Sequence, residues 1–82
     1  LSMPFAYLLR CRDGTLYAGA AVDLDKRLRE HRAGKASRYT RSRLPVELAW
    51  SRELASWSEA LQEEARLKSL TRAEKELLIR PG

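Results

Sequence analysis

The first twenty residues contain two apolar segments separated by a polar turn, and this pattern predicts a β-hairpin. Residues 5–12 (FAYLLRCR) and residues 15–20 (TLYAGA) are rich in aromatic and aliphatic side chains, which favours strands. Asp13-Gly14 stands between them, a dipeptide typical of two-residue hairpin turns. The chain therefore begins its folded part with two antiparallel strands.

The residues after the hairpin predict a helix and a polar connection. Asp23 is a favourable N-cap for a helix over about residues 24–32, and Gly34 is placed to end that helix. Residues 36–44 form a basic, polar connection with room for a helical turn. The helix thus lies between the hairpin and the second half of the chain.

The second half of the chain predicts one more strand and two helices. In residues 46–54, Val46, Leu48 and Trp50 alternate with more polar residues, which indicates a strand with one buried face. Two capping-box patterns follow and predict helix starts, at Ser56-x-x-Glu59 and Thr71-x-x-Glu74. We expect a single domain over residues 1–82 with the order β-β-α-β-α-α. Its fold class is α+β, a small antiparallel three-stranded sheet flanked by helices.

The positive charge is concentrated in one segment. The 82 residues include 16 Lys and Arg against 11 Asp and Glu, for a net charge of +5. Between Lys26 and Arg43 there are eight basic residues and one acidic residue, so the rest of the chain is slightly acidic. A phosphate backbone is the expected partner of such a segment, because Lys and Arg release condensed counterions when they bind phosphates. A solvated basic surface remains the alternative.

The chain has a single cysteine, Cys11, and a single histidine, His31. These two residues cannot form a structural zinc site, which needs four nitrogen or sulfur ligands. One cysteine cannot form an internal disulfide, and no apolar run is long enough to span a membrane. We expect a cytoplasmic protein without a signal peptide or membrane association, in which Cys11 is a half-buried, inert thiol.

Two helices carry charged or polar side chains where apolar ones are expected. Arg27 and His31 share a stripe with Leu24 and Leu28 of the first helix. The functional interpretation is a site on the sheet-facing side of the helix. The structural interpretation is an arginine that extends past the core and a histidine with satisfied hydrogen bonds.

The next long helix repeats this arrangement with a carboxylate. Trp57, Ala60, Leu61 and Glu64 recur at helical spacing, which predicts that Glu64 lies within the apolar stripe whereas other glutamates point away. Glu64 either forms an ion pair with Lys68 one turn later or binds a hard divalent cation. A single carboxylate suits Mg²⁺, which keeps several waters and takes substrate phosphates as further ligands.

The hairpin adds two tyrosines to these polar candidates. With a two-residue turn at Asp13-Gly14, Tyr7 faces Ala20 across the hairpin, and we expect Tyr7 and Tyr17 on the same face of the sheet. Strand tyrosines are commonly structural, and that interpretation stays open beside a catalytic one.

Taken together, these residues resemble the GIY-YIG nuclease superfamily. Phe5-Ala6-Tyr7 keeps the tyrosine of the first family motif, and Tyr17-Ala18-Gly19 keeps the tyrosine and glycine of the second. Residues 23–31 are similar to the family's D-L-x-x-R-L-x-x-H helix, and Glu64 matches its metal-binding glutamate. The likeness covers nearly the whole chain and is to the small stand-alone bacterial members, most of them uncharacterised. The asparagine found after the glutamate helix in several family nucleases has no clear match.

The resemblance implies an endonuclease that hydrolyses DNA phosphodiester bonds with one Mg²⁺ or Mn²⁺ ion and no small-molecule cofactor. Glu64 would hold the metal and Arg27 the scissile phosphate. Tyr7 or Tyr17 would activate the water, and His31 would accept or relay its proton. The remaining candidates would lie along the DNA backbone: Gly19, Lys35, Arg38, Tyr39, Arg41 and Arg43.

The resemblance also implies a setting for this activity. The expected substrate is DNA, branched or damaged, in repair or recombination at the bacterial nucleoid, with a protein partner that directs so small a chain to its target. Two other functions stay open. One is a non-catalytic nucleic-acid-binding module on the same scaffold, and the other is a protein-interaction module with an acidic partner.

Overall fold

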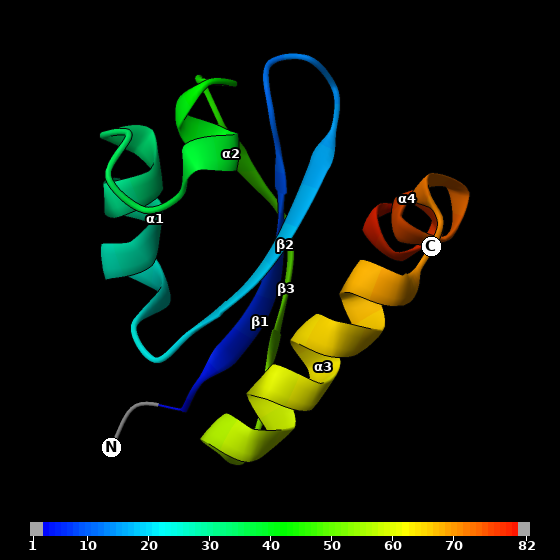
Figure 1. Ribbon diagram of the computed structural model, residues 1–82. Helices are drawn as coiled ribbons and strands as arrows, with labels where there is room; N and C mark the ends of the chain where they lie inside the picture. Colours follow the sequence, from blue (N-terminus) through cyan, green and yellow to red (C-terminus); the bar gives the residue numbers. More distant parts are fainter. Residues whose placement is uncertain (1–2, 81–82) are drawn as a thin grey trace.

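The computed structural model describes residues 3–80 and has the predicted α+β architecture (Figure 1). Its three strands form one antiparallel sheet in the order β2-β1-β3, with β1 at Phe5–Arg10, β2 at Leu16–Ala21 and β3 at Glu47–Glu53. The helices are α1 (Leu24–Arg32), α2 (Arg38–Arg41), α3 (Trp57–Ser69) and α4 (Arg72–Ile79). The short helix α2 is the helical turn expected in the basic connection. Among residues 3–80, no helix is long and apolar enough to cross a membrane.

The sheet separates two apolar clusters. Helices α1 and α2 lie on one side of it and α3 and α4 on the other (Figure 1). Because β1 is the central strand, its alternate side chains enter both sides. Tyr7 and Leu9 pack in the cluster that includes Leu28 of α1, whereas Ala6 and Leu8 pack with residues of α3. We refer to these as the α1 side and the α3 side.

The hairpin turn is longer than predicted, so β1 ends at Arg10 rather than at residue 12. The Gly14 N–H donates to the Cys11 carbonyl at 2.9 Å, and the Cys11 N–H donates to the Thr15 carbonyl at 2.9 Å. Gly14 has a φ of +84°, in the left-handed region that glycine adopts without strain. This is a three-residue hairpin loop with glycine at the left-handed position, not the predicted two-residue turn.

The longer turn shifts the register of the hairpin by one residue. Tyr7 pairs with Gly19 and not with Ala20. A one-residue shift moves side chains to the opposite face, so the predicted register would have separated Tyr7 from Tyr17. In the observed register both tyrosines face the α1 side. The shared face that we predicted is confirmed, but the register from which we inferred it was wrong.

The predicted single buried face of β3 is wrong. Leu8 pairs with Trp50 and Leu9 with Leu48, so Ala49 is an extra residue in β3. Such a bulge reverses the alternation, because the residues on either side of it point to opposite faces. Trp50 packs on the α3 side, whereas Leu48 is exposed.

The buried face of α3 also differs from the prediction. Ala60, Glu63 and Leu67 are buried, whereas Trp57 and Leu61 are exposed. The Glu63 carboxylate accepts two hydrogen bonds from Arg66 at 2.7 Å each and one from Arg52 of β3 at 3.3 Å. The hydrogen bonds from Arg66 are the main reason that the pKa of Glu63 lies below its usual value. A carboxylate paired in this way can be buried, which the apolar stripe could not reveal.

The helix ends follow the local signals closely. Asp23 caps α1 by accepting from the Lys26 N–H at 3.0 Å, and Gly34 follows the helix with a φ of +75°. Thr71 and Glu74 form both hydrogen bonds of a capping box. Cys11 is buried rather than half-buried, and burial raises the pKa of its thiol.

Candidate active site

The ring of His31 lies against both tyrosines of the hairpin. Its centroid is 5.8 Å from that of Tyr7 and 5.5 Å from that of Tyr17, both in edge-on arrangements. The helical spacing that placed His31 on the inner stripe of α1 carries the imidazole onto the sheet, where it is 1% exposed. The structure thus brings together three of the five predicted catalytic residues.

A buried chain of hydrogen bonds runs through this histidine. The Tyr7 hydroxyl lies 2.9 Å from His31 Nε2, and His31 Nδ1 lies 2.9 Å from Thr40 Oγ1. Thr40 donates its own hydroxyl proton to the Ser37 carbonyl at 3.3 Å, so its oxygen accepts from His31. This assigns the proton to Nδ1 and leaves Nε2 free to accept from Tyr7, an assignment made from the network.

Thr40 is a site residue that sequence reasoning missed. It is fully buried at the end of α2, although its neighbours in the basic segment are exposed. The Ser37 hydroxyl accepts from the Thr40 N–H at 3.2 Å and so caps the short helix that carries Thr40. Ser37, three residues before Thr40, was the available sequence signal for this helix start.

Burial keeps the Tyr7 and His31 pair in its neutral form at neutral pH. Burial is the largest cause that raises the pKa of Tyr7 well above its usual value, and Tyr17 adds to this effect. The positive charge of Arg27 opposes it, whereas the charges of Glu64 and Glu30 reinforce it. Burial, and after it the charge of Arg27, lowers the pKa of His31, so its imidazole is available as a proton acceptor.

Gly19 makes room for the Tyr7 ring. The two residues pair across the hairpin, and a Cβ placed on Gly19 would overlap the Tyr7 hydroxyl and lie 2.5 Å from its Cζ. The hydroxyl end of the phenol therefore occupies the space that a side chain at position 19 would need. The sequence placed Gly19 among the residues expected along the DNA backbone, whereas in this structure the Tyr7 ring occupies the space above it.

Gly19→Ala is therefore expected to destabilise the protein by about 1–3 kcal/mol, because the added methyl group displaces a fully buried ring. Urea denaturation of the wild type and the variant would measure this loss. The matched comparison is the same substitution in a Tyr7→Leu background, where the ring is absent and the loss should shrink. An equal loss in both backgrounds would show that Tyr7 is not the group displaced.

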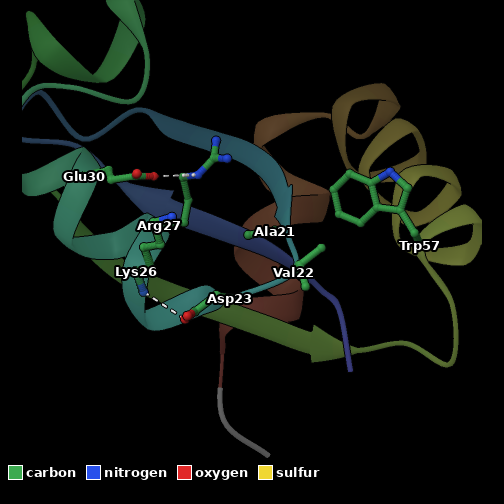
Figure 2. A pocket seen from close by; sticks show the side chains of 7 residues that line it. All are labelled: Ala21, Val22, Asp23, Lys26, Arg27, Glu30 and Trp57. Carbon is green, nitrogen blue, oxygen red and sulfur yellow. Dashed lines mark hydrogen bonds and ion pairs between the residues drawn. The ribbon is translucent and has the colours of Figure 1, made fainter. Parts of the chain in front are cut away.

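Arg27 and Glu64 come from opposite sides of the sheet, on α1 and α3 (Figure 1). Arg27 is half-buried, and its side chain forms an ion pair with Glu30 at 3.2 Å, drawn in Figure 2. Glu64 is also half-buried and pairs with Lys68 at 3.1 Å, the local pairing considered from the sequence. The positive charge of Arg27 lowers the pKa of Tyr7, and the negative charge of Glu64 raises it.

Glu64 is the carboxylate that we considered as a ligand for a divalent metal ion. Within residues 3–80, no group of three His, Cys, Asp or Glu side chains gathers to hold a metal. A single half-buried carboxylate suits Mg²⁺ or Mn²⁺ that keeps waters and takes a substrate phosphate as a further ligand. A bound ion would have to displace Lys68 from the carboxylate.

Apart from Gly19, the predicted DNA-backbone residues divide into two groups. Tyr39 stacks on Tyr17 with centroids 5.7 Å apart, and the Arg43 guanidinium lies 3.7 Å over the Tyr39 ring and pairs with Asp13 at 3.0 Å. These two residues therefore cover the tyrosine and histidine cluster. The others are exposed at a shallow pocket beside α2, namely Lys35, Arg38 and Arg41.

Comparison with known proteins shows the family of this chain. Residues 3–77 match the model of the GIY-YIG catalytic domain. The chain belongs to the GIY-YIG superfamily. A GIY-YIG domain has a nuclease-like fold, and GIY-YIG nucleases generally use a divalent metal and a nucleic-acid substrate.

The GIY-YIG relatives are small proteins of similar length. The chain is 49% identical over 75 residues to the UPF0213 protein of Bacillus pumilus, covering 92% of this chain and 76% of the relative. It is 45% identical over 77 residues to a UPF0213 protein of Halobacterium salinarum, covering 94% and 100%. The solution NMR structure of the UPF0213 protein BH0048 from Bacillus halodurans superposes with a TM-score of 0.60 at 38% identity, covering 93% of this chain and 81% of the other.

Proposed function

We propose that this protein hydrolyses DNA phosphodiester bonds with the help of one Mg²⁺ or Mn²⁺ ion. The observation that carries the proposal is the buried hydrogen-bond chain from Tyr7 through His31 to Thr40, beside which the charges of Arg27 and Glu64 shift the pKa of Tyr7 in opposite directions. A neutral phenol that already donates to a neutral imidazole is suited to moving a proton at the start of hydrolysis.

In the proposed reaction, the attacking water gives a proton to the Tyr7 oxygen while Tyr7 passes its own proton to His31 Nε2. The water oxygen forms a bond to phosphorus, and the bond from phosphorus to the leaving sugar oxygen breaks. The leaving oxygen departs as an alkoxide, which takes a proton from a solvent water to become the free hydroxyl. Thr40 holds the imidazole in the tautomer that accepts at Nε2. Tyr17 packs against His31 and acts here as a positioning residue.

The charged residues have separate roles in this proposal. The Arg27 guanidinium binds the scissile phosphate and stabilises the negative charge that develops on its oxygens. Glu64 holds the metal ion, which when bound supplies positive charge to the leaving oxygen. Lys35, Arg38 and Arg41 contact the flanking backbone from one exposed surface.

Arg27→Ala is expected to slow metal-dependent nicking of supercoiled DNA by about 10-fold or more, because one donor to the developing charge is lost. Arg29→Ala is the matched control, since Arg29 lies on the same helix and is exposed. The assay uses purified protein with Mg²⁺ or Mn²⁺ and an EDTA control. Nicking that is equal in Arg27→Ala and wild type would show that the proposed site is wrong.

A second candidate function is a non-catalytic nucleic-acid-binding module. The ion pair of Glu64 with Lys68, together with the lack of any group of three His, Cys, Asp or Glu side chains among the described residues, favours it. Salt-dependent DNA binding that EDTA does not change, with no cleavage of supercoiled, branched or single-stranded substrates, would support this candidate. Comparison of the branched substrate, and of a damaged duplex added to the set, with supercoiled DNA would report whether the protein prefers branched or damaged DNA.

A further inference from the structure

An exposed tryptophan lines the same pocket as the proposed phosphate-binding arginine. Trp57, the first residue of α3, is 44% exposed, although an aromatic ring of this size usually serves a packing role. It borders a pocket of about 340 Å³ that Arg27 also lines (Figure 2). The pocket spans from α1 to the start of α3 past the end of β2, with Ala21 and Val22 as its apolar part.

The rim of this pocket carries both donors and acceptors. Lys26 and Arg27 supply cationic donors, and Lys26 forms no ion pair within residues 3–80. Asp23 and Glu30 supply carboxylate oxygens that accept hydrogen bonds. An aromatic face, a small apolar wall and mixed polar groups on a rim are the features that bind a flat, polar-edged ring.

We propose that this pocket binds an unpaired nucleobase, stacked on Trp57, next to the phosphate held by Arg27, so that the protein favours single-stranded DNA at this position. The inference rests on the proposed function, because Arg27 fixes the phosphate whose neighbouring base enters the pocket. In a duplex the base faces are covered by their stacked neighbours, so only an unpaired base can offer its face to Trp57.

The position of the pocket supports this occupant over a free small molecule. Arg27 lines the pocket, and its charge also acts on Tyr7 and His31, so one side chain joins the pocket to the candidate site. The basic segment between Lys26 and Arg43 starts at the same pocket. A strand that follows this segment reaches Arg27 with its backbone and Trp57 with one base.

The test measures binding of a labelled single-stranded oligonucleotide and of a duplex of the same sequence, by fluorescence anisotropy in EDTA, so that no cleavage occurs. Trp57→Ala is expected to weaken single-strand binding at least about five-fold, the effect typical of one lost base–aromatic stack. Duplex affinity should change less than the single-strand affinity. Trp57→Phe should restore most of the binding, because phenylalanine also offers a ring face.

Leu77→Ala is the matched control, because Leu77 is an exposed apolar residue of α4, outside the pocket. Equal single-strand affinity of Trp57→Ala and Leu77→Ala would overturn the inference, as would an equal loss on single strand and duplex. Absence of single-strand binding by the wild type would overturn it as well. Nicking that requires Arg27 but not Trp57 would leave the proposed function intact and reject the base pocket alone.

Discussion

Glu64→Gln is expected to reduce metal-dependent DNA cleavage by at least about 100-fold while the fold is preserved, because the only carboxylate proposed to hold the metal is lost. The substitution keeps the size of the side chain, and the ion pair with Lys68 that it breaks is partly exposed and contributes little to stability. Initial nicking rates across a series of Mg²⁺ and Mn²⁺ concentrations would measure the effect.

Glu59→Gln is the matched control for this experiment. Glu59 lies on the same helix and is exposed, so the same chemical change there should leave the nicking rate close to that of wild type and change stability by at most about 0.5 kcal/mol. Circular dichroism would confirm that both variants are folded. Cleavage by Glu64→Gln at the wild-type rate would remove Glu64 from the site and direct attention to a contaminating nuclease.

Tyr7→Phe is expected to slow cleavage by about 100-fold, because it removes the hydroxyl proposed to transfer the proton to His31. The change leaves the ring and its packing over Gly19 in place. Tyr39→Phe makes the same change on a half-exposed ring that stacks on Tyr17, and its rate should stay close to wild type.

The pH dependence of the wild type follows from the state of His31. Its imidazole accepts a proton only when neutral, and burial and Arg27 lower its pKa. The rate should therefore stay high as the pH falls through the usual range for histidine, and decline only below it. A loss of activity centred above the usual histidine pKa, or a Tyr7→Phe variant with the wild-type rate, would contradict the proton transfer through this pair.

Local signals in the sequence were sufficient for the elements of this fold. Asp23 and Gly34 set the ends of α1, and the Thr71 and Glu74 pattern set the start of α4, because capping groups are satisfied by residues a few positions away. Helical periodicity likewise placed His31 on the inner face of α1. The part of the candidate site that depends on helical periodicity could therefore be predicted from the sequence.

The predictions of strand pairing were wrong where one extra residue in a loop or strand moves the following side chains to the opposite face of the sheet. The three-residue loop at Gly14 moved Tyr7 opposite Gly19, and the bulge at Ala49 separated Leu48 from Trp50. Both depend on hydrogen bonds between strands, so neither can be read from the alternation of one strand alone. Glu63 shows a related limit, because its burial depends on Arg52, which reaches it from β3.

The sequence by itself determined the α+β class, the helix ends and the set of residues that resembles the GIY-YIG motifs, because these depend on short-range periodicity and on residue identity. Only the tertiary structure decided that Tyr7 donates to His31, that Thr40 fixes the tautomer and that Trp57 shares a pocket with Arg27. The physical reason is distance along the chain. Tyr7 and His31 are 24 positions apart, and only the packing of α1 on the sheet brings their polar atoms within hydrogen-bond reach.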